Sequence, residues 1–379
     1  MTPIKNLRQY ITFDKRIVSH FDFLIILLLV PILGWSLFLI YELNEYLFQK
    51  QLIYYSIGAV AFFAAFFISW RRIKWLIPSI YWIMILLLVA VEFFGVTKLG
   101  AQRWLEIPLI GLTIQPSELI KPAFLLMMAY LIHDNPPGAK GYNLKEFTKL
   151  SFFILLPFAL ILKEPDLGTA LIILIIGYGI LFLVGVNWRI WAAIVLIVGL
   201  SSPFIYNNLH DYQKKRITDF IGEEPSYHVQ QSIIAVGSGG VKGQDKDSST
   251  QTHLNFLPIA SSDFIFAYLS ERFGFIGGLV LISIYVFLIL HLFSIALFAQ
   301  DDYFLKVIAL GLGFMLFLYM SVNIAMTIGL APVVGLPLPL FSHGGSSFLN
   351  FMVIFGILQN LLAFRFNFLY NSASKTNFK

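Results

Sequence analysis

The stretch FLIILLLVPILGWSLFLIY, residues 23–41, contains no charged side chain. A helix needs about 20 apolar residues to cross the hydrocarbon core of a bilayer, so this stretch predicts a membrane-spanning helix. Nine further apolar runs follow, and together they predict about ten transmembrane helices. These runs lie at about 52–70, 75–95, 116–133, 150–164, 167–186, 190–207, 263–298, 304–330 and 346–366.

The composition agrees with a membrane protein. Hydrophobic residues make up 58% of the 379 residues and charged residues 12%, whereas a soluble domain has about 25% charged residues. No polar stretch is long enough to form a second hydrophobic core, so we expect one all-α transmembrane domain over residues 1–379. The chain has no cysteine and no GxxxxGK[ST] pattern, which excludes thiol chemistry and argues against a nucleotide-binding P-loop.

The basic residues predict the orientation of the helices. Loops on the cytoplasmic side of a membrane are enriched in lysine and arginine, and the same set of loops holds most of these residues if the N-terminus is cytoplasmic. We therefore expect both termini inside and the polar segment at about 208–262, before the eighth span, outside. The basic residues on the inner side are Arg71, Arg72, Lys74, Lys140, Lys145, Lys149, Arg189, Lys306, Arg365, Lys375 and Lys379.

Ionisable residues within or beside the spans are candidates for a functional site, because a charge in lipid is costly. Glu118 and Lys121 are three residues apart and share a helix face. They form either an ion pair that fixes helix packing or a contact with substrate. Asp166 follows Pro165 in a turn and serves either as a cap of that turn or as part of a polar cavity.

Two more charged residues have alternative interpretations. Arg103 beside Trp104 either binds phosphate through its planar guanidinium or anchors the chain at the membrane surface. Asp263 starts the eighth span and is either a helix N-cap or a carboxylate that accepts a proton from a substrate hydroxyl. The proline- and glycine-rich segment at 331–347 is irregular backbone at membrane depth, which predicts that it lines a cavity.

Several separated stretches resemble the SEDS family, the proteins of shape, elongation, division and sporulation. They occur in family order from the third span to the last, so the resemblance covers most of the chain. HDYQKKRI is more similar to the elongation branch than to the division branch. The stretches are LGAQRWL at 99–105, QPSELIK at 115–121, EPDLGT at 164–169, HDYQKKRI at 210–217, THLNFLP at 252–258, SDFIFA at 262–267 and APVVGLPLPLFSHGGSS at 331–347.

The resemblance implies a ten-helix peptidoglycan glycosyltransferase in the bacterial cytoplasmic membrane, with its active site on the outer face. Such an enzyme polymerises lipid II, an undecaprenyl-diphosphate-linked disaccharide pentapeptide, into β-1,4-linked strands during elongation and rod-shape maintenance, with inversion at the donor's anomeric carbon. Its implied partners are a class B penicillin-binding protein and other elongation-complex proteins, and no nucleic acid. A divalent cation, Mg2+ or Mn2+, is an optional cofactor, and no metal ligands are assigned.

The resemblance also assigns roles to residues. Asp263 is the expected catalytic base. The residues expected to bind substrate are Arg103, Lys121, Arg216, Ser262, Ser342 and Ser346. The residues expected to shape the cavity are Glu118, Asp166 and Glu271.

The chain departs from the family pattern beside this aspartate. The family has LPE-x-HTD, whereas this chain reads LPIASSD, so Ile259 replaces the acid and Ser261 the histidine. His343 stands where the family has tyrosine. Two other functions fit the same architecture. One is a lipid II flippase, which needs a polar path through both leaflets, and the other is a noncatalytic scaffold for the penicillin-binding protein.

Overall fold

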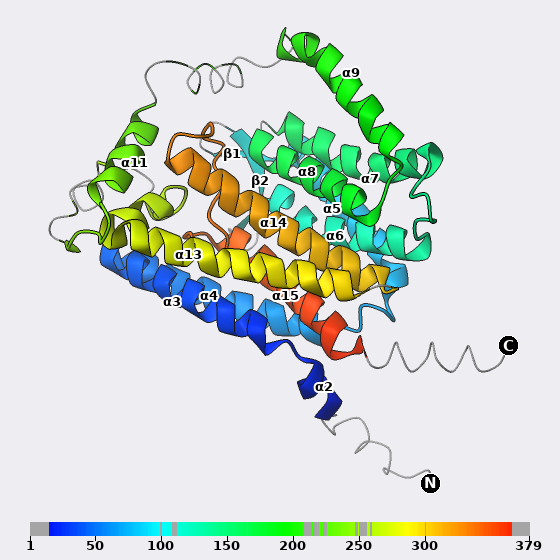
Figure 1. Ribbon diagram of the computed structural model, residues 1–379, viewed down its shortest axis with the longest axis horizontal. Helices are drawn as coiled ribbons and strands as arrows, with labels where there is room; N and C mark the ends of the chain where they lie inside the picture. Colours follow the sequence, from blue (N-terminus) through cyan, green and yellow to red (C-terminus); the bar gives the residue numbers. More distant parts are fainter. Residues whose placement is uncertain are drawn as a thin grey trace.

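The computed structural model describes most of the chain. Its described residues are 15–98, 101–107, 112–164, 166–207, 226–246, 260–299 and 301–365, together with residues 214, 218, 220, 222, 249, 256 and 257. Helices dominate this part of the chain, as expected from the sequence (Figure 1).

Ten helices in the described residues are 18 residues or longer, and they coincide with the ten apolar runs. They are α3 (Phe23–Leu43), α4 (Glu45–Phe67), α5 (Ile77–Phe94), α6 (Pro116–Asp134), α7 (Leu144–Lys163), α8 (Leu167–Val184), α9 (Trp188–Asn207), α13 (Ile265–Phe298), α14 (Tyr303–Thr327) and α15 (Gly345–Ala363). Shorter helices are α2 (Lys15–His20), η2 (Lys74–Leu76) and α11 (Tyr227–Ser238).

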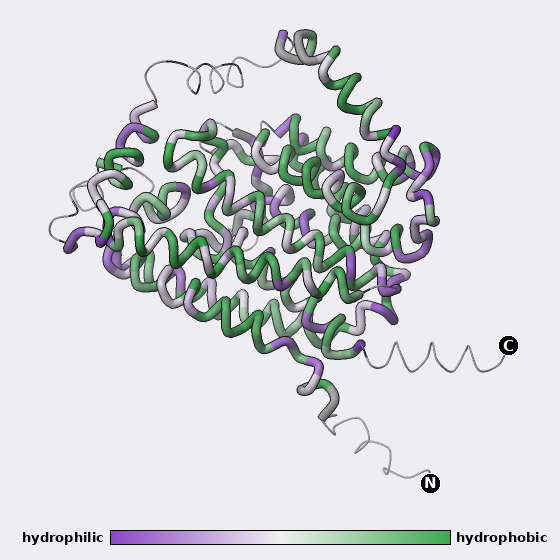
Figure 2. The backbone as a smooth tube through the Cα atoms, viewed as in Figure 1, coloured by the Kyte–Doolittle hydropathy of each residue, from purple (hydrophilic) through white to green (hydrophobic). Residues whose placement is uncertain are grey.

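Seven helices in the described residues are long and apolar enough to cross a membrane, with α5 counted together with η2. The remaining long helices are α6 and α7, which carry more charge, and α9, whose apolar part is shorter. Figure 2 shows hydrophobic residues along the middle of the helices and hydrophilic residues gathered toward the ends. The protein is therefore a multi-pass membrane protein.

Polar side chains start several helices. Asp22, Asn44 and Asp302 accept hydrogen bonds from the first backbone N–H groups of α3, α4 and α14. Asn143 and Glu146 form a capping box at the start of α7. Because these caps satisfy N–H groups that have no partner inside the helix, they set where each span begins.

The helices pack as an elongated bundle. α13 and α14 run side by side through its middle, α15 packs against α4, and the pairs α5–α6 and α7–α8 complete the other side (Figure 1). α9 extends away from the bundle, with aromatic contacts from Trp191 to Phe147, Tyr178 and Phe182 near its first turn. Most of its other apolar side chains are exposed, as expected of a helix that faces lipid.

Two features between the spans were not predicted. A small antiparallel sheet connects α5 to α6, with strands β1 (Val96–Lys98), β2 (Ala101–Ile107) and β3 (Leu112–Ile114) in that order. The polar segment before α13 contains the helix α11, which packs against α13. The predominantly helical fold is confirmed, and the sheet is an addition to it.

The long helix α13 contains a kink. Gly274 inside α13 has φ +65° and ψ −163°, a conformation that side chains with a Cβ rarely adopt. Its neighbours in space are the backbone atoms of Val241 and Gly243, which follow α11. The bend in α13 therefore provides the place where the segment after α11 fits.

The bundle has two ends with different polar groups. We call the end where α6, α8, α13 and α15 begin the site end, and the opposite end the base end. At the base end, Asp22 contacts His291 at 2.6 Å, and Lys74 pairs with Asp134 at 2.9 Å. The residues of the expected active site that the structure describes lie toward the site end.

Candidate active site

Asp263 lies in the turn before α13 and is held through its backbone. The buried Asn323 of α14 donates hydrogen bonds from Nδ2 to the carbonyl oxygens of Asp263 at 2.9 Å and Leu336 at 2.7 Å. One amide group therefore joins the turn, the end of α14 and the segment after it. Sequence reasoning missed Asn323, although a polar side chain within an apolar span was a signal that could have found it.

The segment 331–344 is fastened to the same turn. Ser342 Oγ donates to the carbonyl oxygen of Ser262 at 2.6 Å and accepts from the N–H of Leu338 at 2.8 Å. The N–H of His343 donates to the carbonyl oxygen of Ser261 at 2.8 Å. The irregular segment thus packs against the Asp263 turn, and Ser342 links Leu338 to Ser262. That it lines a cavity stays a prediction.

The carboxyl group of Asp263 faces this segment. A Cβ placed on Gly335, which has φ +72°, would lie 3.7 Å from Asp263 Oδ2. Burial raises the pKa of Asp263 above its usual value, and a hydrogen bond with Ser262 opposes that shift. The N-cap residue of α13 is Phe264, without a side-chain capping bond, so the helix-cap alternative for Asp263 does not describe this structure.

Asp166 and Arg103 form a second polar group at the start of α8. Asp166 accepts a hydrogen bond from the N–H of Thr169 at 3.2 Å and one from Gln115 Nε2 at 3.3 Å. Its other neighbour is Arg103 of β2, with Nη1 3.9 Å from Oδ1. Asp166 therefore caps α8, which is one of its two expected roles, and its carboxylate also lies near Arg103.

The second polar group lies close to the Asp263 turn. A Cβ placed on Gly168, in the first turn of α8, would meet the carbonyl oxygen of Val334 at 2.8 Å. Val334 and Gly335 are adjacent, so one side of this segment contacts α8 and the other contacts Asp263. The structure thus brings together Asp263, Ser262 and Ser342 on one side and Arg103 and Asp166 on the other.

Glu118 and Lys121 form a buried ion pair between three helices. Lys121 Nζ contacts a carboxylate oxygen of Glu118 and the hydroxyl of Tyr319 of α14. Asn350 of α15 donates from Nδ2 to Glu118 Oε2 at 3.1 Å. Lys121 is 3% exposed, so its ammonium group is already surrounded by partners. This favours the alternative in which the pair fixes helix packing, because removing either charge would leave the other buried and unpaired.

Glu164, at the end of α7, is buried beside this cluster. Its backbone oxygen accepts a hydrogen bond from Arg103 Nε at 3.1 Å, while both carboxyl oxygens are buried without a hydrogen-bond partner among the described residues. Burial and the nearby charge of Asp166 raise the pKa of Glu164 to about 8. This raised pKa favours the neutral form of the Glu164 carboxyl group.

The remaining predicted residues are more distant or undescribed. Ser346 lies exposed in the first turn of α15. Glu271 is fully buried two turns along α13, and its carbonyl oxygen accepts a hydrogen bond from the N–H of Gln244. The next residue, Arg272, pairs with Glu42 of α3 at 2.8 Å, a partner that sequence spacing does not reveal. Arg216 lies outside the described residues.

The described residues do not supply a ligand set for a divalent cation. Among them, no group of three or more His, Asp or Glu side chains is placed to hold a metal ion. Protein sites for Mg2+ commonly use one or two carboxylates together with substrate phosphates. Among the residues that the structure describes, Asp263 is not part of such a group.

The fold and this site define a multi-pass membrane protein with a polar site at one end of its bundle. The family profile described as cell cycle protein, of FtsW, RodA and SpoVE, matches residues 13–366. The chain therefore belongs to the SEDS family, which confirms the resemblance seen in the sequence.

Curated relatives cover nearly the full chain. The peptidoglycan glycosyltransferase MrdB of Helicobacter pylori strain ATCC 700392 / 26695 is 57% identical over 360 residues, which cover 95% of this chain and 94% of the relative. The protein of the same name from Escherichia coli K12 is 37% identical over 353 residues, covering 90% and 93%.

Solved structures share the fold. A chain from a study of polymerization and crosslinking by a peptidoglycan synthase complex has a TM-score of 0.79 and 26% identity, covering 91% of this chain and 98% of that chain. The rod shape determining protein RodA of Thermus thermophilus has a TM-score of 0.68 and 26% identity, with the same coverage.

Proposed function

We propose that this protein polymerises lipid II into β-1,4-linked glycan strands, with Asp263 as the catalytic base. As a SEDS protein with curated relatives named peptidoglycan glycosyltransferase at up to 57% identity in the comparisons above, the chain is a peptidoglycan glycosyltransferase. The observation that carries the catalytic assignment is the placement of Asp263. Its carboxyl group is partly buried and faces an irregular segment at the site end.

The proposed reaction is a single inverting displacement. The carboxylate of Asp263 takes the proton from the 4-hydroxyl of the acceptor sugar, and the oxygen attacks the anomeric carbon of the donor. The bond from that carbon to the phosphate oxygen breaks, and its electron pair leaves with undecaprenyl diphosphate. A base whose pKa is raised by burial binds this proton more strongly than an exposed aspartate would.

The leaving diphosphate needs positive charge nearby. Arg103 is suited to this role because its side chain remains 24% exposed and lies beside the segment that faces Asp263. Asp166 and the Glu164 carbonyl oxygen hold the guanidinium in place. Lys121 acts through its ion pair with Glu118, which keeps α6, α14 and α15 together beneath the site.

The proposal includes an orientation and partners. The site end faces the outside of the cytoplasmic membrane and both termini lie in the cytoplasm, because this places most lysines and arginines of the loops inside. Lipid II reaches the site from the outer leaflet. A class B penicillin-binding protein is the proposed partner that cross-links the new strands, in agreement with the likeness to a chain studied in a peptidoglycan synthase complex.

The test is lipid II polymerisation by the purified protein together with its penicillin-binding partner, whose own activity is blocked. We expect Asp263→Asn and Asp263→Ala to slow strand formation at least about 100-fold, a typical effect of losing a general base. Asp245→Asn is the matched control, because it removes a carboxylate from an exposed position on the segment after α11.

The outcomes separate the alternatives. Strands from the wild type and the control, but not from folded Asp263 variants, support Asp263 as the base. Continued polymerisation by the variants contradicts that assignment. If the wild type makes no strands with its partner, a lipid II translocation assay distinguishes a flippase from a scaffold.

A further inference from the structure

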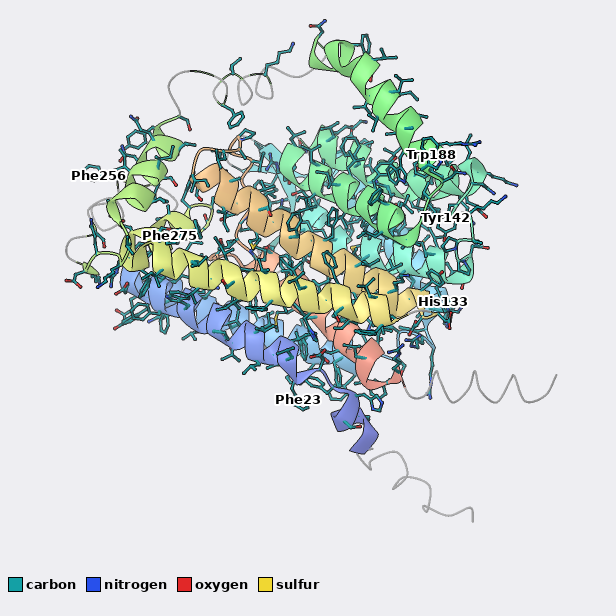
Figure 3. The ribbon with its side chains drawn as sticks, viewed as in Figure 1. Phe23, His133, Tyr142, Trp188, Phe256 and Phe275 are labelled. Atoms are coloured by element: carbon teal, nitrogen blue, oxygen red, sulfur yellow. The ribbon has the colours of Figure 1, made fainter. Side chains whose placement is uncertain are left out.

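A large pocket lies at the base end, far along the bundle from Asp263. It has a volume of about 620 Å³ and is formed where α6 ends and α7 begins. Figure 3 labels Tyr142, which lines it, on the same side of the molecule as Trp188 at the start of α9. Hydrogen bonds between the backbones of Tyr142 and the segment Gly185–Asn187 hold these elements together.

The charge of the pocket is positive. Lys145 and Lys149 line it and are four residues apart on one face of α7. Glu146 is the acidic residue among those that line it, and its carboxylate already accepts a hydrogen bond from the N–H of Asn143 at 3.0 Å within the capping box. Two ammonium groups against one occupied carboxylate favour an anionic ligand.

The inner wall of the pocket is apolar. Leu131 of α6 and Leu150 of α7 are 8% and 4% exposed, and the ring of Tyr142 is almost fully buried. The lysine face of α7 continues to Phe152, seven residues after Lys145, whose side chain is 52% exposed. The basic surface at the lysines is thus followed along α7 by an apolar surface. A ligand that combines a negative head group with an apolar chain matches this arrangement.

The pocket also lies at a suitable depth. Leu144 lies between two residues that line the pocket, and Trp188 follows Asn187, whose N–H donates to the carbonyl oxygen of Tyr142. Their side chains are 66% and 72% exposed. Exposed tryptophan at the end of a span is typical of the membrane–water interface. The lysines and arginines of the loops predict that this end of the bundle faces the cytoplasm. Basic pockets between transmembrane helices on the cytoplasmic side bind the head groups of anionic lipids.

We propose that this pocket binds an anionic phospholipid of the inner leaflet. Lys145 and Lys149 pair with the phosphate of its head group, and its acyl chains lie along α7 over Phe152. The lipid fills a groove between α6 and α7, and it ties the start of α7 to the end of α6. The proposal is independent of the proposed reaction, because the pocket and Asp263 lie at opposite ends of the bundle.

The test measures lipid binding to the full chain in detergent by native mass spectrometry and thermal unfolding. The probes are phosphatidylglycerol, phosphatidylcholine and inorganic phosphate. We expect Lys145→Gln/Lys149→Gln to weaken phosphatidylglycerol binding about 30-fold, from the typical contribution of two lysines near a membrane surface. Lys140→Gln/Arg189→Gln is the matched control, since it removes two exposed charges of the same end that do not line the pocket.

A third variant tests whether the shape of the pocket, and not only its charge, is needed for lipid binding. Asn135→Trp places a large ring on an exposed residue at the pocket while both lysines remain, and it should also weaken binding. The proposal is overturned if the control pair loses as much affinity as the lysine pair, if phosphatidylcholine binds as well as phosphatidylglycerol, or if Asn135→Trp binds normally. Equal stabilisation by inorganic phosphate would identify an anion site without a lipid.

Discussion

Asp263 is positioned by its backbone, which leaves its carboxyl group available for chemistry. Asn323 and Ser342 hold the carbonyl oxygens of Asp263 and Ser262, so the turn is fastened without the side chain of Asp263. An aspartate that capped α13 would be tied to backbone N–H groups, and its pKa would be lowered rather than raised. The residues around it thus support a base rather than a cap.

The pH dependence of the reaction follows from this environment. Burial raises the pKa of Asp263, and the base acts only when ionised, so the rate should fall as the pH falls through that raised pKa. Ser262→Ala removes the hydrogen bond that lowers the pKa. We expect the acidic limb of the pH–rate profile to move to higher pH, with a smaller change in rate on the alkaline side.

The matched control for this prediction is Ser261→Ala. Ser261 contacts His343 through its backbone oxygen, which the substitution keeps. Its profile should follow the wild type. If Ser262→Ala lowers the rate equally at every pH, Ser262 acts on substrate binding instead of on the pKa of Asp263.

At the scale of elements, glycines decide how α11 meets α13. A Cβ on Gly239 would lie 1.9 Å from the backbone oxygen of Ser270, and a Cβ on Gly243 would lie 2.2 Å from that of Arg272. Two hydrogen bonds, from Phe275 N–H to Gly240 and from Gln244 N–H to Glu271, connect the same backbones. This contact secures the segment that leads toward the Asp263 turn.

Gly239→Ala should therefore destabilise the protein. The clash is with backbone atoms that have no rotamer to change, so α11 must move away from α13, at a cost of about 1–3 kcal/mol. Gly237→Ala, two residues earlier in the same region, meets nothing within 4 Å and should leave the stability equal or slightly higher. Thermal unfolding of both purified variants checks this, and equal unfolding temperatures would contradict the packing argument.

At the scale of the molecule, the two ends of the bundle are built from different structural elements and polar contacts. The site end combines the irregular segment 331–344, the sheet and α11, which all lie between spans. The base end is closed by ion pairs between helices, such as Arg71–Asp302 and Lys74–Asp134. The proposed reaction and the proposed lipid contact therefore lie at opposite ends of one helical bundle.

The orientation of these ends can be tested with single cysteines, because the chain has none of its own. Lys242→Cys lies exposed beside α11, and Lys140→Cys lies exposed at the base end. In spheroplasts, a membrane-impermeant maleimide should label the first variant and leave the second unlabelled until the membrane is opened. The reverse pattern would overturn the proposed orientation and place Asp263 inside the cell.

The sequence alone was sufficient to predict the ten long helices, because the length and polarity of each apolar run indicate a helix suited to a membrane. Its residues also indicated the family. The roles expected of Asp263, Arg103 and Asp166 remain predictions. The position of the kink in α13, at Gly274, could not be predicted from the sequence.

Only the tertiary structure revealed which distant residues meet. Asn323 donates hydrogen bonds to the carbonyl oxygens of Asp263 and Leu336, and Arg272 forms an ion pair with Glu42 of α3. The sheet between α5 and α6 was likewise not predicted, and the sequence left two alternatives open for the pair of Glu118 and Lys121. Hydropathy specifies which segments enter the membrane, whereas contacts between segments depend on how their faces pack, and that packing decided the geometry of the site.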